Sequence, residues 1–156
     1  MPIKLLFVCL GNICRSPLAE AIFQLKIKEV GLEEDISSQS CGTANYHIGD
    51  MPDPRTIRNA FKNGIHINHV GRQLSSADLD AFDFVLAMDQ SNMDNIKQLP
   101  GAKANLHKIS LMRNYDPIGK GLDVPDPYYG NEKDFQDVFD ILNRSIDALI
   151  ESLRKT

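Results

Sequence analysis

Residues 3–17, IKLLFVCLGNICRSP, join an apolar strand to the start of a helix through a short loop. The apolar run 3–8 predicts a buried parallel strand, and Pro17 followed by LAEAIF predicts the first turns of a helix. The backbone N–H groups of such a turn have no partner within the helix, and the helix N-terminus carries a partial positive charge. The loop is therefore suited to binding a phosphate group.

Two side chains in this loop favour phosphoryl transfer over simple binding. The field of a helix N-terminus and a neighbouring arginine both stabilise a thiolate, so Cys9 is expected to be a nucleophile at neutral pH. Arg15 offers a planar fork that binds two phosphate oxygens at once. The alternative for Cys9 is a buried apolar residue at a strand end. Arg15, Ser16 and the helix start that follows favour the nucleophile.

Composition excludes several classes of protein. A chain of 156 residues with 42% hydrophobic and 24% charged residues is typical of one globular domain, here 1–156. The net charge of -4 gives no basic footprint for nucleic acid or an anionic membrane, and no apolar run is long enough for a membrane span. Three cysteines, an odd number, indicate free thiols in a reducing compartment, so we expect a cytoplasmic protein. We expect a monomer, with a weak dimer as the alternative.

Strand and helix signals alternate along the chain. Further strands are expected at 35–40, 82–88 and 106–109, and helices after Asp53-Pro54, after Ser75, over 91–99 and over the amphipathic stretch 135–153. This alternation predicts an α/β domain with a parallel sheet and helices on both faces. Such sheets bind ligands at the carboxyl ends of their strands, which is where Cys9 lies.

A long polar loop before the last helix contains three aspartates close to prolines: Asp116, Asp123 and Asp126. A loop of this length in a small domain is more often functional than accidental. An oxygen leaving group departs more readily when a positioned acid protonates it, so one of these carboxyl groups is a candidate general acid. Their spacing alone does not choose among the three.

The motifs at both ends of the chain resemble one family. VCLGNICRSP at 8–17 and DPYYG at 126–130 resemble the phosphate-binding loop and the general-acid loop of the low-molecular-weight protein tyrosine phosphatases, with further matches at 53–55, 72–74 and 88–92. The resemblance implies a four-stranded parallel sheet flanked by helices, with no metal or other cofactor. It implies hydrolysis of phosphotyrosine in proteins, and of small aryl phosphates, through a phosphocysteine. It selects Asp126 as the general acid and later base, and implies that phosphate, sulfate or vanadate binds in the loop.

Supporting roles follow for the residues around the loop. Ser16 is expected to donate its hydroxyl to the Cys9 sulfur, and Asn12 tolerates the left-handed backbone of a tight turn. The resemblance suggests Ser40 and His69 as partners of Asn12. The remaining loop residues expected around the phosphate are Leu10, Gly11, Ile13 and Cys14. Three tyrosines are expected at the rim of the cleft: Tyr46, Tyr128 and Tyr129.

A protective disulfide, a zinc site and two other functions are the further interpretations that the sequence suggests. Cys14, five residues after Cys9, is close enough along the loop to form a protective disulfide on oxidation. His66 and His69 lack the third ligand of a zinc site, so no metal is expected. An arsenate reductase of the same fold needs further cysteines in the middle of the chain, and none follows Cys41. A phosphotyrosine-binding module without turnover has no use for a leaving-group acid.

Overall fold

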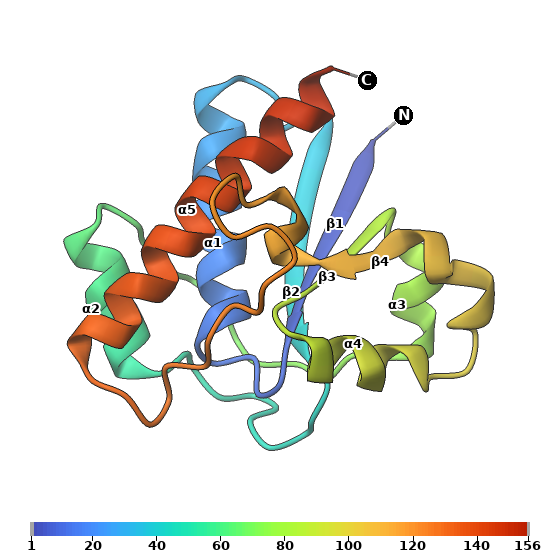
Figure 1. Ribbon diagram of the computed structural model, residues 1–156, viewed down its shortest axis with the longest axis horizontal. Helices are drawn as coiled ribbons and strands as arrows, with labels where there is room; N and C mark the ends of the chain where they lie inside the picture. The colour runs from blue at the N-terminus through green and yellow to red at the C-terminus, as the bar shows by residue number, and fades with distance from the viewer. Residues whose placement is uncertain (1, 156) are drawn as a thin grey trace.

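Four parallel strands form one sheet in the order β2-β1-β3-β4 (Figure 1). The computed structural model describes residues 2–155. The strands are β1 (Ile3–Cys9), β2 (Ile36–Gly42), β3 (Phe84–Ala87) and β4 (Ile109–Leu111). The predicted class, an α/β fold with a four-stranded parallel sheet between helices, is confirmed.

Helices cover both faces of this sheet. The α-helices are α1 (Arg15–Glu29), α2 (Pro54–Lys62), α3 (Ser76–Ala81), α4 (Gln90–Lys97) and α5 (Glu132–Arg154), and two 3-10 helices are η1 (Lys103–Lys108) and η2 (Met112–Tyr115). On one face α1 and the long α5 pack side by side, and α2 packs against α5 (Figure 1). On the other face lie α3 and α4.

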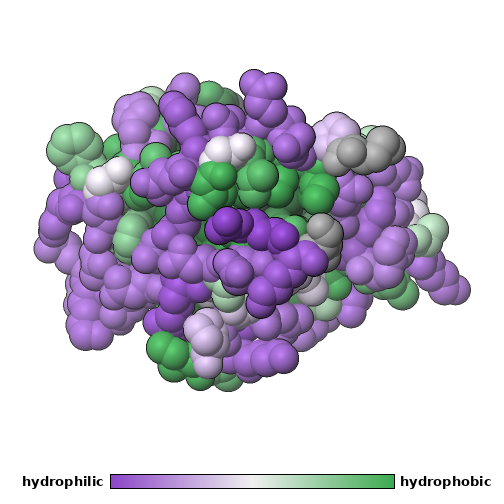
Figure 2. Space-filling view, turned by 90° about the horizontal axis from the view of Figure 1, so that it is seen from above, coloured by the Kyte–Doolittle hydropathy of each residue, from purple (hydrophilic) through white to green (hydrophobic). Residues whose placement is uncertain are grey.

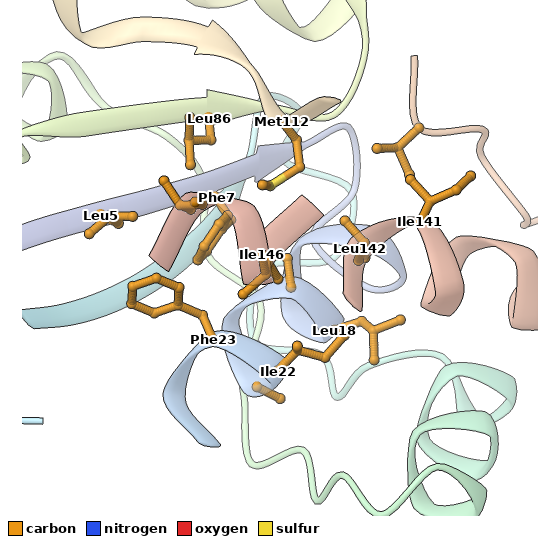
Figure 3. Close-up of a cluster of buried hydrophobic side chains, with 14 of the residues drawn as sticks. Leu5, Phe7, Leu18, Ile22, Phe23, Leu86, Met112, Ile141, Leu142 and Ile146 are labelled. Atoms are coloured by element: carbon orange, nitrogen blue, oxygen red, sulfur yellow. The ribbon is translucent and has the colours of Figure 1, made fainter. Parts of the chain in front are cut away.

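The central strand β1 explains why residues 3–8 are almost uniformly apolar. Leu5 and Phe7 belong to the core beneath α1 and α5, whereas Leu6 and Val8 belong to the core beneath α3 and α4. All four side chains have no exposed surface. A strand buried on both faces cannot alternate with polar residues. Figure 3 shows the larger core, in which Phe7 meets Phe23 of α1 edge to face at 5.7 Å between ring centroids.

Local signals set most element ends correctly. Helix α1 ends before Gly31, which has a φ of 75° as a left-handed helix stop requires. Asp53 caps α2 by accepting a hydrogen bond from the Arg55 N–H, and Pro54 occupies the first turn. Ser75 and Asp78 form the predicted capping box of α3. These predictions are confirmed because each depends on residues within one turn of chain.

The prediction of a strand at 106–109 is wrong. Residues 103–108 form η1, and the strand is the three-residue β4 that follows. Leu106, whose apolar side chain suggested the strand, is 48% exposed. The buried Asn105 donates hydrogen bonds to Asp80 and to the Gly101 carbonyl, which stabilises a turn at this point. The strand that forms contains the buried Ile109 and Leu111, one on each side of Ser110.

The carboxyl ends of the strands meet at one end of the molecule, the lower end in Figure 1. The neighbours of β1 in the sheet are β2 and β3, which the chain reaches on opposite sides of it. The end of β1 therefore lies at the switch point where ligands bind in open parallel sheets. Both termini lie at the opposite end, whose surface is largely hydrophilic (Figure 2). Between residues 2 and 155, no helix is long and apolar enough to cross a membrane.

Replacing Leu142 of α5 by alanine should lower the free energy of unfolding by roughly 2–5 kcal/mol, because the side chain is fully buried between α1 and the sheet. The same substitution at Leu122, which is 57% exposed, serves as the matched control and should cost far less. Urea unfolding followed by circular dichroism measures both values. Equal losses for the two variants would contradict this assignment of the core.

Candidate active site

The loop that follows β1 brings the first predicted site residues together. Cys9 ends the strand, and its Sγ lies 2.9 Å from the Ser16 Oγ in the first turn of α1. The Asn12 N–H donates a hydrogen bond to the same sulfur at 3.3 Å. The Cys9 sulfur therefore has two hydrogen-bond partners within the loop and the first turn of α1, in a residue that is only 3% exposed.

Asn12 holds this loop in shape. It has a φ of 59°, in the left-handed region that asparagine tolerates better than most residues, and is 1% exposed. Its Nδ2 donates to the Ser16 Oγ at 2.8 Å and to the Ser40 Oγ at 3.1 Å. Its Oδ1 accepts from the Arg72 N–H at 3.0 Å and lies 2.8 Å from the His69 Nε2. Ser40 and His69 thus lie behind the loop, in contact with Asn12.

Sequence reasoning missed Glu20, which joins this set of contacts. The Ser40 hydroxyl donates to Glu20 at 2.6 Å, and the His69 Nδ1 lies 3.3 Å from the same carboxylate oxygen. Glu20 follows Ser16 by one helical turn on α1, so the two side chains share a face. The four-residue spacing between Ser16 and Glu20 is the sequence signal that could have identified Glu20.

Gly42, at the end of β2, was also missed. A Cβ at this position would lie 2.7 Å from the Leu10 carbonyl oxygen and 3.1 Å from the Asn12 nitrogen. Any side chain would therefore push against the backbone of the loop. Glycine lets β2 end directly against the loop, so the Gly42 position fixes where the loop lies.

Arg15 is almost fully buried, at 2% exposure, and its charge is matched by acidic groups. Its Nη1 donates to the Asp89 carboxylate and to the Val124 carbonyl, each at 2.8 Å. Burial opposes the charge, but the negative groups at Cys9, Asp89 and Asp126 raise the pKa of Arg15 above its usual value. The guanidinium remains a cation. Asp89 was not predicted as a site residue, although it follows β3, the neighbour of β1.

The structure separates the three aspartates of the long loop. Asp116 is 1% exposed and bound by Arg113 and Arg144, which with the backbone hydrogen bonds hold its pKa well below the usual range. Asp123 accepts a hydrogen bond from the Gln90 N–H. The Asp126 side chain is 44% exposed, and its Oδ2 lies 3.7 Å from the Arg15 Nη2. Of the three, Asp126 is the one that lines the same cleft as Cys9 and Arg15.

A cleft of about 280 Å³ opens over the loop. Its predicted lining residues are the loop members Cys9, Leu10, Gly11, Ile13, Cys14 and Arg15, together with Asp126 and the rim residues Tyr46, Tyr128 and Tyr129. His47, which the sequence did not single out, also lines it, and its Nδ1 lies 3.0 Å from Asp50. Asn12, Ser16, Ser40 and His69 are absent from the lining and contact the loop from behind.

The rim is aromatic. Tyr128 and Tyr129 meet edge to face at 5.0 Å between ring centroids, and Tyr129 is 96% exposed. Tyr46, from the loop after β2, is 70% exposed. Aromatic surfaces standing above a small anion-binding loop suit a flat, apolar group attached to phosphate.

Comparisons with known proteins agree with this geometry. Residues 4–156 match the model of the family described as low molecular weight phosphotyrosine protein phosphatase. The enzyme of that name from Schizosaccharomyces pombe is 46% identical over 140 residues, covering 88% of each chain. The Gallus gallus enzyme is 44% identical over 152 residues, covering 95% of this chain and 94% of the relative.

Solved structures agree as well. A protein tyrosine phosphatase from Entamoeba histolytica with Hepes in the active site has a TM-score of 0.93 at 39% identity, covering 98% of this chain and 97% of the other. Both the sequence match and the structural match extend over nearly the whole chain. The chain belongs to the low molecular weight phosphotyrosine protein phosphatase family, a family of hydrolases.

Proposed function

We propose that this protein hydrolyses phosphotyrosine in protein substrates through a phosphocysteine intermediate at Cys9. The observation that carries the proposal is that one cleft, at the carboxyl end of β1, contains the Cys9 thiol, the Arg15 guanidinium and the Asp126 carboxyl group. A nucleophile, a fixed cation and a proton donor are the groups that this displacement requires.

In the first step the Cys9 thiolate attacks phosphorus. The S–P bond forms while the P–O bond to the tyrosyl oxygen breaks, and Asp126 transfers its proton to that oxygen so that a neutral phenol leaves. Arg15 and the backbone N–H groups of the loop stabilise the charge on the equatorial phosphate oxygens. Because Arg15 is held through Nη1 by Asp89 and Val124, its orientation is set before the substrate arrives.

In the second step water attacks the phosphorus of the phosphocysteine. The Asp126 carboxylate, now ionised, accepts a proton from that water as the S–P bond breaks. The thiolate returns to Cys9 and inorganic phosphate is released. Ser16, 2.9 Å from the sulfur, assists both steps, since a hydrogen bond that favours the thiolate also makes it a better leaving group.

Two alternative functions are less well supported. An arsenate reductase of this fold passes a disulfide to further cysteines, and the chain has none after Cys41. A binding module without turnover gains nothing from a carboxyl group 3.7 Å from the phosphate-binding arginine. Both alternatives predict no release of phosphate from a phosphotyrosine peptide.

Substituting Cys9 by serine should abolish phosphate release from a phosphotyrosine peptide, and Asp126→Ala should lower kcat by roughly 10²–10⁴-fold, the usual contribution of a general acid. The loss at Asp126 should be larger for phenyl phosphate than for p-nitrophenyl phosphate, because nitrophenolate leaves without protonation. Steady-state phosphate release with a chelator and a reductant present measures all three effects.

The matched control for Asp126 is Asp123→Asn, in the same loop but hydrogen-bonded to the Gln90 N–H. It should retain kcat within a few-fold. If Asp123→Asn lost as much as Asp126→Ala with the same dependence on the leaving group, Asp126 would not be the acid. Tight binding of phosphotyrosine peptide by the wild type without turnover would favour the binding module.

We also propose that Cys14 protects Cys9 from irreversible oxidation. Both residues line the same cleft, and burial raises the pKa of Cys14 to about 12, with a smaller contribution from the negative charge of Cys9. Conversion of Cys9 to a sulfenic acid removes that charge and makes the Cys14 thiolate easier to form. The Cys14 thiolate then attacks the Cys9 sulfur, the S–S bond forms as the S–O bond breaks, and the hydroxide that leaves takes up a proton to become water.

Mild peroxide should therefore produce a peptide linking Cys9 and Cys14, detected by non-reducing peptide mapping. Disulfide formation after Cys9 oxidation should become faster as pH rises, because the attacking species is the thiolate and the pKa of Cys14 lies above neutrality. The Cys14→Ser variant should instead accumulate Cys9 sulfinic acid. Free Cys14 persisting beside oxidised Cys9 in the wild type would contradict the proposal.

A further inference from the structure

A second groove, of about 360 Å³, lies between α2 and the start of α5. Arg55, Arg58 and Lys62 of α2 form one wall, and Glu132 and Phe135 of α5 contribute to the other. Three cations against one carboxylate give this groove a positive excess, although the whole chain has a net charge of -4. A local reversal of sign on an acidic protein points to an anionic partner.

The three cations differ in whether they form an ion pair within the protein. Arg55 is held by Asp53, with Nη2–Oδ2 and Nε–Oδ1 distances of 2.8 and 3.1 Å. Arg58 and Lys62 are exposed, and within residues 2–155 neither has a carboxylate at ion-pair distance. Arg58 acts on Asp53 through space, with a smaller effect on its pKa than Arg55, and both Arg58 and Lys62 remain accessible to a ligand.

The groove adjoins the catalytic cleft through Arg55. Its guanidinium carbon lies 5.3 Å from the ring centroid of Tyr128, which lines the cleft, and 4.7 Å from that of Phe135, which lines the groove. Arg55 and Tyr128 thus form a shared wall. A peptide with its phosphotyrosine in the cleft needs to cross only this wall to enter the groove.

The walls of the groove are fixed relative to one another. Asn59 of α2 and Asn63, the residue that follows this helix, both donate to the Gln136 side chain of α5, at 2.9 and 3.0 Å. Phe135, beside Gln136, is 4% exposed, and Val138 one turn further along α5 belongs to the core. Binding there does not have to order the two helices first, which lowers its entropic cost.

We propose that this groove binds the acidic side chains that flank the phosphotyrosine of a protein substrate, with Arg58 and Lys62 as the groups that recognise them. The inference rests on the proposed function, since it assigns a substrate preference to the same active site. Carboxylates are the expected ligands because the two cations are exposed and separate, which suits individual aspartate or glutamate side chains. Such contacts at a solvent-accessible rim act mainly on substrate capture.

The test compares three substrates: a phosphotyrosine peptide with Asp or Glu on either side, the same peptide with Asn or Gln there, and a small aryl phosphate. In the variant Arg58→Glu/Lys62→Glu, kcat/KM for the acidic peptide should fall about tenfold, or about 1.4 kcal/mol, as expected for two exposed charge pairs. For the neutral peptide and the aryl phosphate, kcat/KM should stay within about twofold.

The matched control is Lys97→Glu/Lys103→Glu, which makes the same change in net charge at two exposed residues on α4 and η1. An equal loss in this variant would mean that only the overall field of the protein acts, and no loss in the Arg58/Lys62 variant would mean that substrates do not enter the groove. Either result overturns the proposal. Partition of the wild type to anionic vesicles without any peptide preference would also overturn it.

A second measurement separates this proposal from the proposed function. Peptide affinity can be measured by fluorescence anisotropy in the Cys9→Ser background. It should be about tenfold higher for the acidic peptide than for the neutral one, and Arg58→Glu/Lys62→Glu should remove this difference. If the wild type fails to hydrolyse the aryl phosphate, the proposed function fails. The binding preference still shows whether the groove recognises acidic side chains. If the aryl phosphate is hydrolysed and the binding preference is absent, the groove proposal alone fails.

Discussion

Asn12 lies in a left-handed backbone conformation in the loop that follows β1, and its side chain contacts three other segments of the chain. Its amide contacts Ser16 on α1, Ser40 on β2, His69 and the backbone of Arg72. Because Asn12 is 1% exposed, its amide oxygen and nitrogen depend on these partners, and removing both partners of either atom would leave a buried polar group unpaired. The curvature of the loop, and with it the direction of its N–H groups, depends on this side chain.

The buried charge of Arg15 imposes a second requirement. A guanidinium at 2% exposure needs partners for its hydrogen bonds and its charge, and Asp89 and the Val124 carbonyl supply them at Nη1 from two other segments. Asp89 also accepts from the Asn92 N–H and so begins α4. One carboxylate therefore fixes both a helix start and the orientation of Arg15, which couples the end of β3 to the loop after β1.

The parts of the fold that could be predicted from sequence are those encoded locally. The uniform apolarity of β1, the proline and aspartate before α2 and the capping box before α3 act within a few residues of where they stand. The strand at 109–111 was misplaced because three residues carry little periodic signal beside the apolar Leu106. Asp89 was missed because it meets Arg15 across 74 positions of sequence, a pairing that only the sheet order creates.

The three aspartates of the long loop show why residue type and spacing could not choose a candidate for the proposed general acid. Asp116 is neutralised in the core by Arg113 and Arg144, and Arg113 also donates to the Asp123 carbonyl, which ties the loop to α5 through the same cluster. A carboxylate whose pKa is held this far down has no proton to give near neutral pH. Asp126, whose side chain is 44% exposed, instead lies in the cleft with its Oδ2 3.7 Å from the Arg15 Nη2. The buried aspartate and the exposed one are thus complementary, since the first holds in place the loop that carries the second.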